Sequence, residues 1–217
     1  LRQMQVISDM KNLQMLKQKH TETQSALRRR VTVELPQELA ATENRLAQLK
    51  ADMDGYTETP VLELDGRRYE AMTDEAAEHF RAICEKTPHG QTVGTYGGMK
   101  ITVRTAQLLT GAAVGQELLL TGAGCYRTDA GQSARGNLTR IANLYKGLPD
   151  MEKDTQARLG FLRNQLAEST KQAEKPFERE EELSALQREL EEINARLQVD
   201  KDEVAVETQE AEPTRGA

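Results

Sequence analysis

Five apolar residues near the C-terminus recur at spacings of three and four: Leu183, Leu186, Leu190, Ile193 and Leu197. Charged residues such as Arg188 and Glu191 stand between them. This heptad pattern predicts an amphipathic helix with a narrow apolar seam, running from about 178 to 198. Such a helix cannot bury its seam alone, so a second helix must lie beside it.

A matching seam lies in the N-terminal part of the chain, in a helix expected from about Pro36 to Asp54. Its apolar positions are spaced by seven, three and four residues: Leu39, Leu46, Leu49 and Met53. Proline suits the first turn of a helix, and Gly55 is expected to end it. We therefore expect this helix to pair with the C-terminal seam within one chain. A homodimer through the helices is the alternative.

Two further helices are expected outside these seams. Val6, Met10 and Leu13 predict one over residues 1–30, and the β-branched run 31–35 before Pro36 predicts a break after it. The other is expected over 150–175, where Pro176 ends it. Beyond residue 200 the chain is acidic and poor in aromatic residues, which is typical of a flexible tail.

Between Gly55 and Gly147 the apolar pattern becomes that of short strands. Asp65-Gly66 between two β-prone segments predicts a hairpin, and Gly97-Gly98 predicts another turn. Thr73 and Asn137 are each expected to cap a helix, while residues 106–116 fit either a loop or a strand. The segment predicts a small α+β module of about six short strands.

The predicted fold class is therefore α+β: a long antiparallel, coiled-coil-like stalk formed by N- and C-terminal helices, with a small β-rich domain inserted between them. The expected domains are 1–54 (N-terminal stalk helices), 55–147 (α+β domain), 148–199 (C-terminal stalk helices) and 200–217 (acidic flexible tail). The composition agrees, because 37% hydrophobic and 29% charged residues favour solvated helices over one large core.

The sequence contains no recognisable catalytic motif. The chain contains neither the phosphate-binding pattern G-x-x-x-x-G-K-[ST] nor a zinc-binding H-E-x-x-H nor a G-x-S-x-G elbow. We expect no enzyme activity, no cofactor and no metal. No stretch approaches the ~20 apolar residues of a membrane span, and no apolar signal-peptide core is recognisable. These features predict a cytoplasmic protein without membrane contacts.

Charge is distributed unevenly, which suggests a candidate nucleic-acid interface. Residues 81–147 hold eight basic and three acidic residues, whereas 176–217 hold five basic and thirteen acidic residues. Aromatic and basic side chains on one sheet face could stack on bases and pair with phosphates. The candidates lie on or near predicted strands: Tyr96, Lys100, Arg104, Tyr126, Arg127, Arg135 and Arg140. The alternative is a solvated sheet face whose tyrosines complete the core.

Several short motifs together resemble a known family. They are Leu64-Asp-Gly-Arg-Arg-Tyr69, Val93-Gly-Thr-Tyr-Gly-Gly98, Gly136-Asn-Leu-Thr-Arg-Ile-Ala-Asn143 and the segment from Glu174 to Leu183. The set is similar to the C-terminal region of large Snf-type (DEAD/DEAH) helicases of bacterial conjugative and mobile elements, often fused to an adenine-specific DNA methyltransferase. The matching residues are Asn137, Arg140, Asn143, Lys175, Pro176, Phe177, Glu180 and Leu183. The chain departs from the family pattern at Leu138, Ile141 and Met99.

The resemblance implies a fragment whose parent protein is an ATP-dependent helicase acting on DNA. Such a fragment would be a non-catalytic accessory module that positions the parent helicase on DNA or on a protein partner. The alternative is a module that binds nucleic acid directly through the basic and aromatic sheet face. The implied partners are the remainder of the parent helicase and, where the fragment itself contacts it, DNA.

Overall fold

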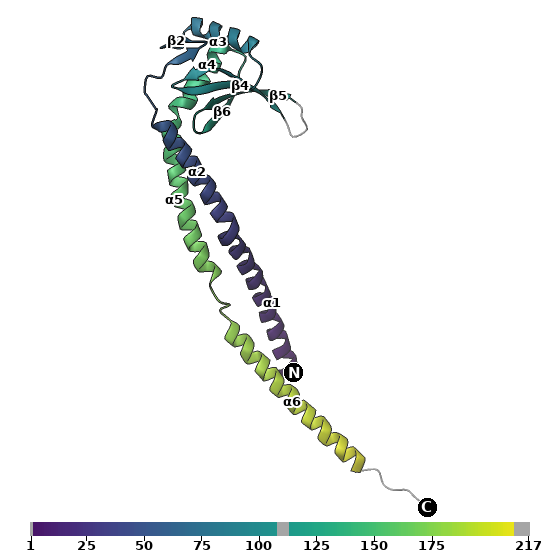
Figure 1. The fold of residues 1–217 in the computed structure, drawn as a ribbon. Coiled ribbons are helices and arrows are strands. Elements are labelled where there is room, and N and C mark those ends of the chain that lie inside the picture. Colours follow the sequence, from purple (N-terminus) through teal and green to yellow (C-terminus); the bar gives the residue numbers. More distant parts are fainter. Residues whose placement is uncertain (1, 108–112, 211–217) are drawn as a thin grey trace, which may run out of the picture. The chain divides into compact units, whose positions relative to one another are not determined.

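Helical backbone runs without a break from Arg2 to Met53 in the computed structural model, which describes residues 2–107 and 113–210. It consists of α1 (Arg2–Arg29), a π-helical turn (η1, Arg30–Glu34) and α2 (Leu35–Met53) (Figure 1). The break expected at 31–36 is therefore wrong. In the π-helical turn the N–H of Leu35 donates to the carbonyl of Arg30. This wider turn lets the helix continue through Pro36, whose ring would crowd an ordinary α-helical turn.

The chain divides into two compact units, which are described separately. The helical unit comprises Leu1–Leu35 and Gln165–Ala217, and the sheet unit comprises Pro36–Asn164. The fold class is confirmed as α+β, with antiparallel helix pairs formed by N- and C-terminal segments and a sheet between them in sequence. None of the described helices combines the length and apolar character needed to cross a membrane.

In the helical unit, α6 (Glu180–Glu210) lies antiparallel to α1 (Figure 1). The amide of Gln3 donates to Asn194 (2.7 Å), whereas Lys17 pairs with Glu180 (2.6 Å) near the other end. The apolar stripe of α1, with Val6 and Leu13 buried, and the seam of α6, with Leu183 buried, supply the interior of this pair. The C-terminal seam therefore does find a partner within the chain.

That partner differs from the one expected. The seam of Leu39, Leu46, Leu49 and Met53 belongs to α2, in the sheet unit, and does not pair with α6. There, α2 is linked to α5 (Leu148–Ala173) by ion pairs from Glu38 to Arg158 (3.2 Å) and from Glu43 to Arg163 (2.9 Å). The reason is connectivity: α5 directly follows the sheet domain, so it is the first returning helix and lies beside α2.

The remaining boundaries differ less from expectation. A non-helical segment around Pro176 separates α5 from α6, as expected. The flexible tail expected from residue 200 is wrong in its boundary, because α6 continues to Glu210, and residues 211–217 lie outside the described residues. Along the seam of α6, Leu183 is buried, Leu186, Leu190 and Ile193 are half-buried, and Leu197 is exposed.

Replacing Leu183 with alanine is expected to loosen α1 rather than α2. Leu183 is 3% exposed, so truncation removes buried apolar contacts worth about 2–3 kcal/mol. Amide hydrogen exchange should therefore accelerate over Arg2–Arg29. Leu197→Ala is the matched control, because Leu197 is 42% exposed and its truncation should leave the exchange of α1 unchanged. Faster exchange in α2 alone would contradict the observed pairing.

The sheet unit holds a six-stranded antiparallel sheet in the order β2-β1-β3-β4-β5-β6. Its strands are β1 (Leu62–Leu64), β2 (Arg67–Tyr69), β3 (Thr92–Tyr96), β4 (Met99–Gln107), β5 (Ala113–Thr121) and β6 (Cys125–Asp129). Asp65 and Gly66 adopt positive φ in the turn between β1 and β2, as expected for a tight hairpin. Within the ambiguous stretch 106–116, the described residues belong to β4 and β5, and 108–112 lie outside the described residues.

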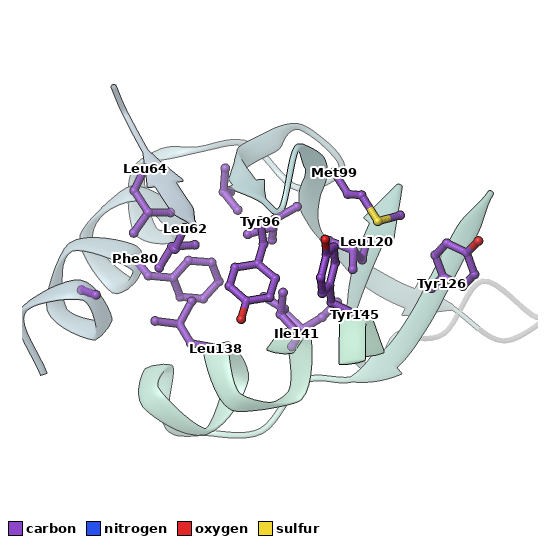
Figure 2. Close-up of a cluster of buried hydrophobic side chains, with 14 of the residues drawn as sticks. Leu62, Leu64, Phe80, Tyr96, Met99, Leu120, Tyr126, Leu138, Ile141 and Tyr145 are labelled. Carbon is purple, nitrogen blue, oxygen red and sulfur yellow. The ribbon is translucent and has the colours of Figure 1, made fainter. Parts of the chain in front are cut away.

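Two helices pack on one face of the sheet. Thr73 accepts a hydrogen bond from Ala76 and caps α3 (Asp74–Lys86), as expected. The next helix, α4 (Ala134–Lys146), begins earlier than expected, because Ser133 rather than Asn137 is its N-cap. Both helices contribute to one apolar cluster with the sheet, shown in Figure 2: Phe80 from α3, Leu138, Ile141 and Tyr145 from α4, and Leu62, Leu64, Tyr96, Met99 and Leu120 from strands.

The C-terminal end of α2 and the N-terminal end of α5 reach the same cluster. Leu49 of α2 and Leu148 of α5 are fully buried in it, and Met53 and Met151 pack against it. Because the last turns of α2 and the first turns of α5 meet at this core, the two helices run antiparallel. The sheet domain and this helix pair therefore share one hydrophobic core.

Candidate nucleic-acid interface

Three of the basic candidates lie on the outward face of the sheet, the face opposite α3 and α4. Lys100 and Arg104 alternate along β4 with the buried Ile101, and Arg127 follows the buried Tyr126 on β6. Successive strand residues point to opposite faces, so the exposed cations lie on the side away from the core. The structure thus brings these three candidates onto one surface.

Acidic side chains interrupt that surface. The guanidinium of Arg104 pairs with Glu117 (2.8 Å), its cross-strand neighbour, and Glu117 is in turn opposite Asp129. Toward the other edge of the sheet, Glu63 pairs in register with Arg68. The outward face therefore alternates cations and anions, whereas a phosphate-binding surface would present one sign of charge.

The two tyrosine candidates are not on this face. Tyr96 is 8% exposed and packs edge-to-face on Tyr145, with ring centroids 5.3 Å apart. Tyr126 is 2% exposed and lies at the end of the row of core residues in Figure 2. The expectation that their rings would stack on bases is wrong, because both rings complete the core. This outcome matches the alternative noted for the tyrosines.

Tyr126 instead takes part in a contact that the sequence reasoning missed. Its hydroxyl donates to Asp52 of α2 (2.7 Å), and the backbone N–H groups of Ala123 and Gly124 donate to the same carboxylate (2.6 and 2.9 Å). The guanidinium of Arg45, also on α2, lies 4.5 Å from the centre of the Tyr126 ring. These contacts, which we call the Asp52 clamp, fasten the end of α2 to the β5–β6 turn.

The clamp is maintained across neutral pH. Burial, followed by the hydrogen bond to Asp52, raises the pKa of the Tyr126 phenol above its ordinary value. The phenol is therefore protonated and able to donate at every pH below the usual tyrosine pKa of about 10. The contribution of this hydrogen bond to stability is lost only as the pH rises above about 10.

The two remaining candidates, Arg135 and Arg140, lie on α4. The exposed face of this helix carries Arg135, Thr139, Arg140, Asn143 and Lys146, and α4 contains no acidic residue among its thirteen. The opposite face of the helix is buried and carries Leu138, Ile141 and Tyr145. We call the five exposed residues the α4 face. Among the candidates expected from sequence, only Arg135 and Arg140 belong to it. Lys146, in the last turn of α4, is the third cation of this face and is not among those candidates.

The guanidinium of Arg140 lies against the loop before α4. The side-chain amide of Asn137 donates to the carbonyl of Gly131 (3.0 Å) and accepts from its N–H (2.6 Å), which closes the loop against the helix. The guanidinium of Arg140 lies over this loop, so close that a Cβ on Gly131 would be 2.6 Å from its Nη1 atom. A glycine at 131 therefore leaves the room that this position of Arg140 requires.

Arg135 has an acidic partner on the neighbouring helix. Its guanidinium pairs with Asp74 at the start of α3. Both side chains are largely exposed, and exposed ion pairs of this kind contribute about 0–1 kcal/mol. The pair therefore adds little stability, and it places one carboxylate beside the α4 face.

The two thiols differ in their surroundings. Burial raises the pKa of the Cys84 thiol to about 11, so this group is protonated near neutral pH. Cys125 is exposed at the start of β6. Within residues 2–107 and 113–210, no three His, Cys, Asp or Glu side chains are grouped closely enough to hold a metal ion.

Comparison with known proteins identified no matching family model, no matching curated protein and no matching solved structure.

Proposed function

We propose that this chain is a non-catalytic accessory module of a larger DNA-acting protein of the Snf-type helicase class, and that it positions that protein on nucleic acid. In this proposal the α4 face makes the contact. The α2–α5 pair, which shares the core of the sheet, supports this face and connects it to the rest of the parent protein.

The observation that carries the proposal is the charge of the α4 face. Three cations and two neutral hydrogen-bonding side chains are exposed along one helix that lacks carboxylates. One of the cations, Arg135, pairs with Asp74 of α3, and no ion pair is formed by Arg140 or Lys146 among the described residues. Lys and Arg side chains on one surface neutralise phosphates and release bound counterions, which supplies most of the affinity for nucleic acid. Arg140 and Asn143, two residues that carry the resemblance to the helicase family, are both part of this face.

The outward face of the sheet is the alternative surface, and its charges favour a different ligand. Arg104 is engaged by Glu117, and Asp129 and Glu63 add negative charge to that face. Mixed charges suit a protein partner with complementary charges better than a polyanion. Positioning on a protein partner through the outward face is thus the second candidate function.

DNA binding by the full chain tests which surface acts. In fluorescence anisotropy with a labelled DNA, we expect the Arg140→Glu/Lys146→Glu variant to lose about tenfold or more in affinity at low salt, with a shallower dependence on salt. The matched control, Lys100→Glu/Arg127→Glu, makes the same charge change in the same unit but on the outward face of the sheet. We expect it to change affinity by no more than about threefold, through net charge alone.

Two results would contradict the proposal. A wild-type chain that does not bind DNA at low salt has no positioning function on nucleic acid. A loss of affinity in the sheet variant, with the α4 variant unaffected, would move the interface to the outward face. Circular dichroism melting curves of both variants separate loss of binding from loss of folding.

A further inference from the structure

We infer that the nucleic acid bound by the α4 face is a double helix and that α4 lies in its major groove. This inference rests on the proposed function and names its ligand more narrowly. It is carried by three properties of α4: the burial of its one aromatic ring, its dimensions, and the order of side chains along the α4 face.

The burial of the aromatic ring of α4 argues against a single strand as the ligand of this helix. Proteins that hold single strands stack successive bases on exposed aromatic side chains. The only aromatic residue of α4 is Tyr145, which is buried and accepts a hydrogen bond from the N–H of Thr57 (2.9 Å). Tyr56 lies stacked on it, with ring centroids 4.9 Å apart. The α4 face therefore offers bases no ring to stack on.

The dimensions of α4 suit a groove. Its thirteen residues make a rod about 20 Å long, and the major groove of B-DNA, about 12 Å wide, admits one α-helix. Arg135, Thr139, Asn143 and Lys146 follow one another at spacings of four, four and three residues, which aligns them in one stripe. All four residues of the stripe are exposed.

The order of side chains along the stripe matches the two kinds of contact that a helix makes in a groove, which are contacts to phosphates and contacts to bases. Cations stand at its two ends, with Arg135 in the first turn of α4 and Lys146 in the last. These ends lie about 16 Å apart, so both can reach backbone phosphates on the flanks of the groove. Asn143 presents an amide that donates and accepts, the group that pairs with the edge of adenine in the major groove.

The first experiment compares a duplex of about 20 base pairs with each of its separated strands, in anisotropy titrations with the full chain. We expect the duplex to bind at least about tenfold more tightly at equal salt. Methyl green, a major-groove ligand, should displace the protein from the duplex, whereas netropsin, a minor-groove ligand, should not.

Two variants separate groove contact from charge. Asn143→Ala should weaken duplex binding several-fold, leave the salt dependence unchanged and leave any residual single-strand binding unchanged. Lys146→Ala should weaken binding to all sequences alike and lower the slope of log affinity against log salt by about 1. Both positions are exposed on α4, so neither substitution removes a core contact.

The outcomes that overturn the inference differ from those that overturn the proposed function. Equal affinity for single strands and duplex, or displacement by netropsin and not by methyl green, would refute major-groove binding while leaving a nucleic-acid module in place. An Asn143→Ala variant whose only effect is on the salt slope would also refute it. Absence of binding to either form of DNA would refute the proposed function, and this inference with it.

Discussion

Replacing Asp52 with alanine is expected to lower the free energy of unfolding of the sheet unit by about 3 kcal/mol. The substitution removes the acceptor of three hydrogen bonds, from Ala123 N–H, Gly124 N–H and the Tyr126 hydroxyl. Gly124 and Tyr126 are buried and their bonds to Asp52 are partly buried, so these two donors would be poorly solvated without the carboxylate. Urea denaturation followed by circular dichroism measures the change.

Two further substitutions give this experiment its controls. Asp54→Ala removes an exposed carboxylate two residues away, just past the end of α2, and should change stability by no more than about 0.5 kcal/mol. Asp52→Asn keeps an oxygen acceptor and should fall between the two. If Asp52→Ala were as stable as Asp54→Ala, the clamp would not be a significant source of stability.

The second large effect is expected at the turn between β3 and β4. Gly97 and Gly98 both have positive φ, at 55° and 82°, where a side chain costs about 1–2 kcal/mol. A Cβ on Gly97 would in addition overlap the ring of Tyr145, whereas a Cβ on Gly98 has no atom within 4 Å. Tyr145 is buried and cannot withdraw, so overpacking adds about 1–3 kcal/mol at Gly97 only.

Comparing Gly97→Ala with Gly98→Ala isolates this contact, because the backbone cost is shared. We expect Gly97→Ala to unfold at a clearly lower urea concentration than Gly98→Ala. Equal midpoints would mean that the ring of Tyr145 moves freely, which its hydrogen bond to Thr57 and its stack with Tyr56 argue against. The single variant Tyr145→Phe tests that hydrogen bond separately.

Features that depend on neighbouring residues were predictable. The Asp65-Gly66 hairpin, the Thr73 cap and the helix break at Pro176 were all expected from residues within one turn of each other. Even here one local rule misled, because Pro36 was expected to end a helix and the π-helical turn before it accommodates the ring. A proline excludes the ordinary turn but does not exclude a wider one.

The candidate site was only partly predictable, and the reason is the pleat of the strands. Tyr126 and Arg127 are neighbours in sequence, and neighbours in a strand point to opposite faces, so they could not belong to one surface. Alternation alone was enough to separate them. The Asp52 clamp was not accessible in this way, since Asp52 and Gly124 lie far apart in the chain and only the packed core brings them together.

Local sequence determined most of the helices and strands, because apolar spacing and turn residues act within a few positions, but it did not determine that the helix continues through 31–36. It also determined that a narrow leucine seam near the C-terminus needs a helical partner. Which helix that partner would be was decided only by the tertiary structure: α1 lies against the seam, and α2 lies with α5. Any apolar helix stripe can pack against any other. The choice of partner therefore depends on the order of the helices along the chain and on the shared core that holds α2 and α5 at the sheet.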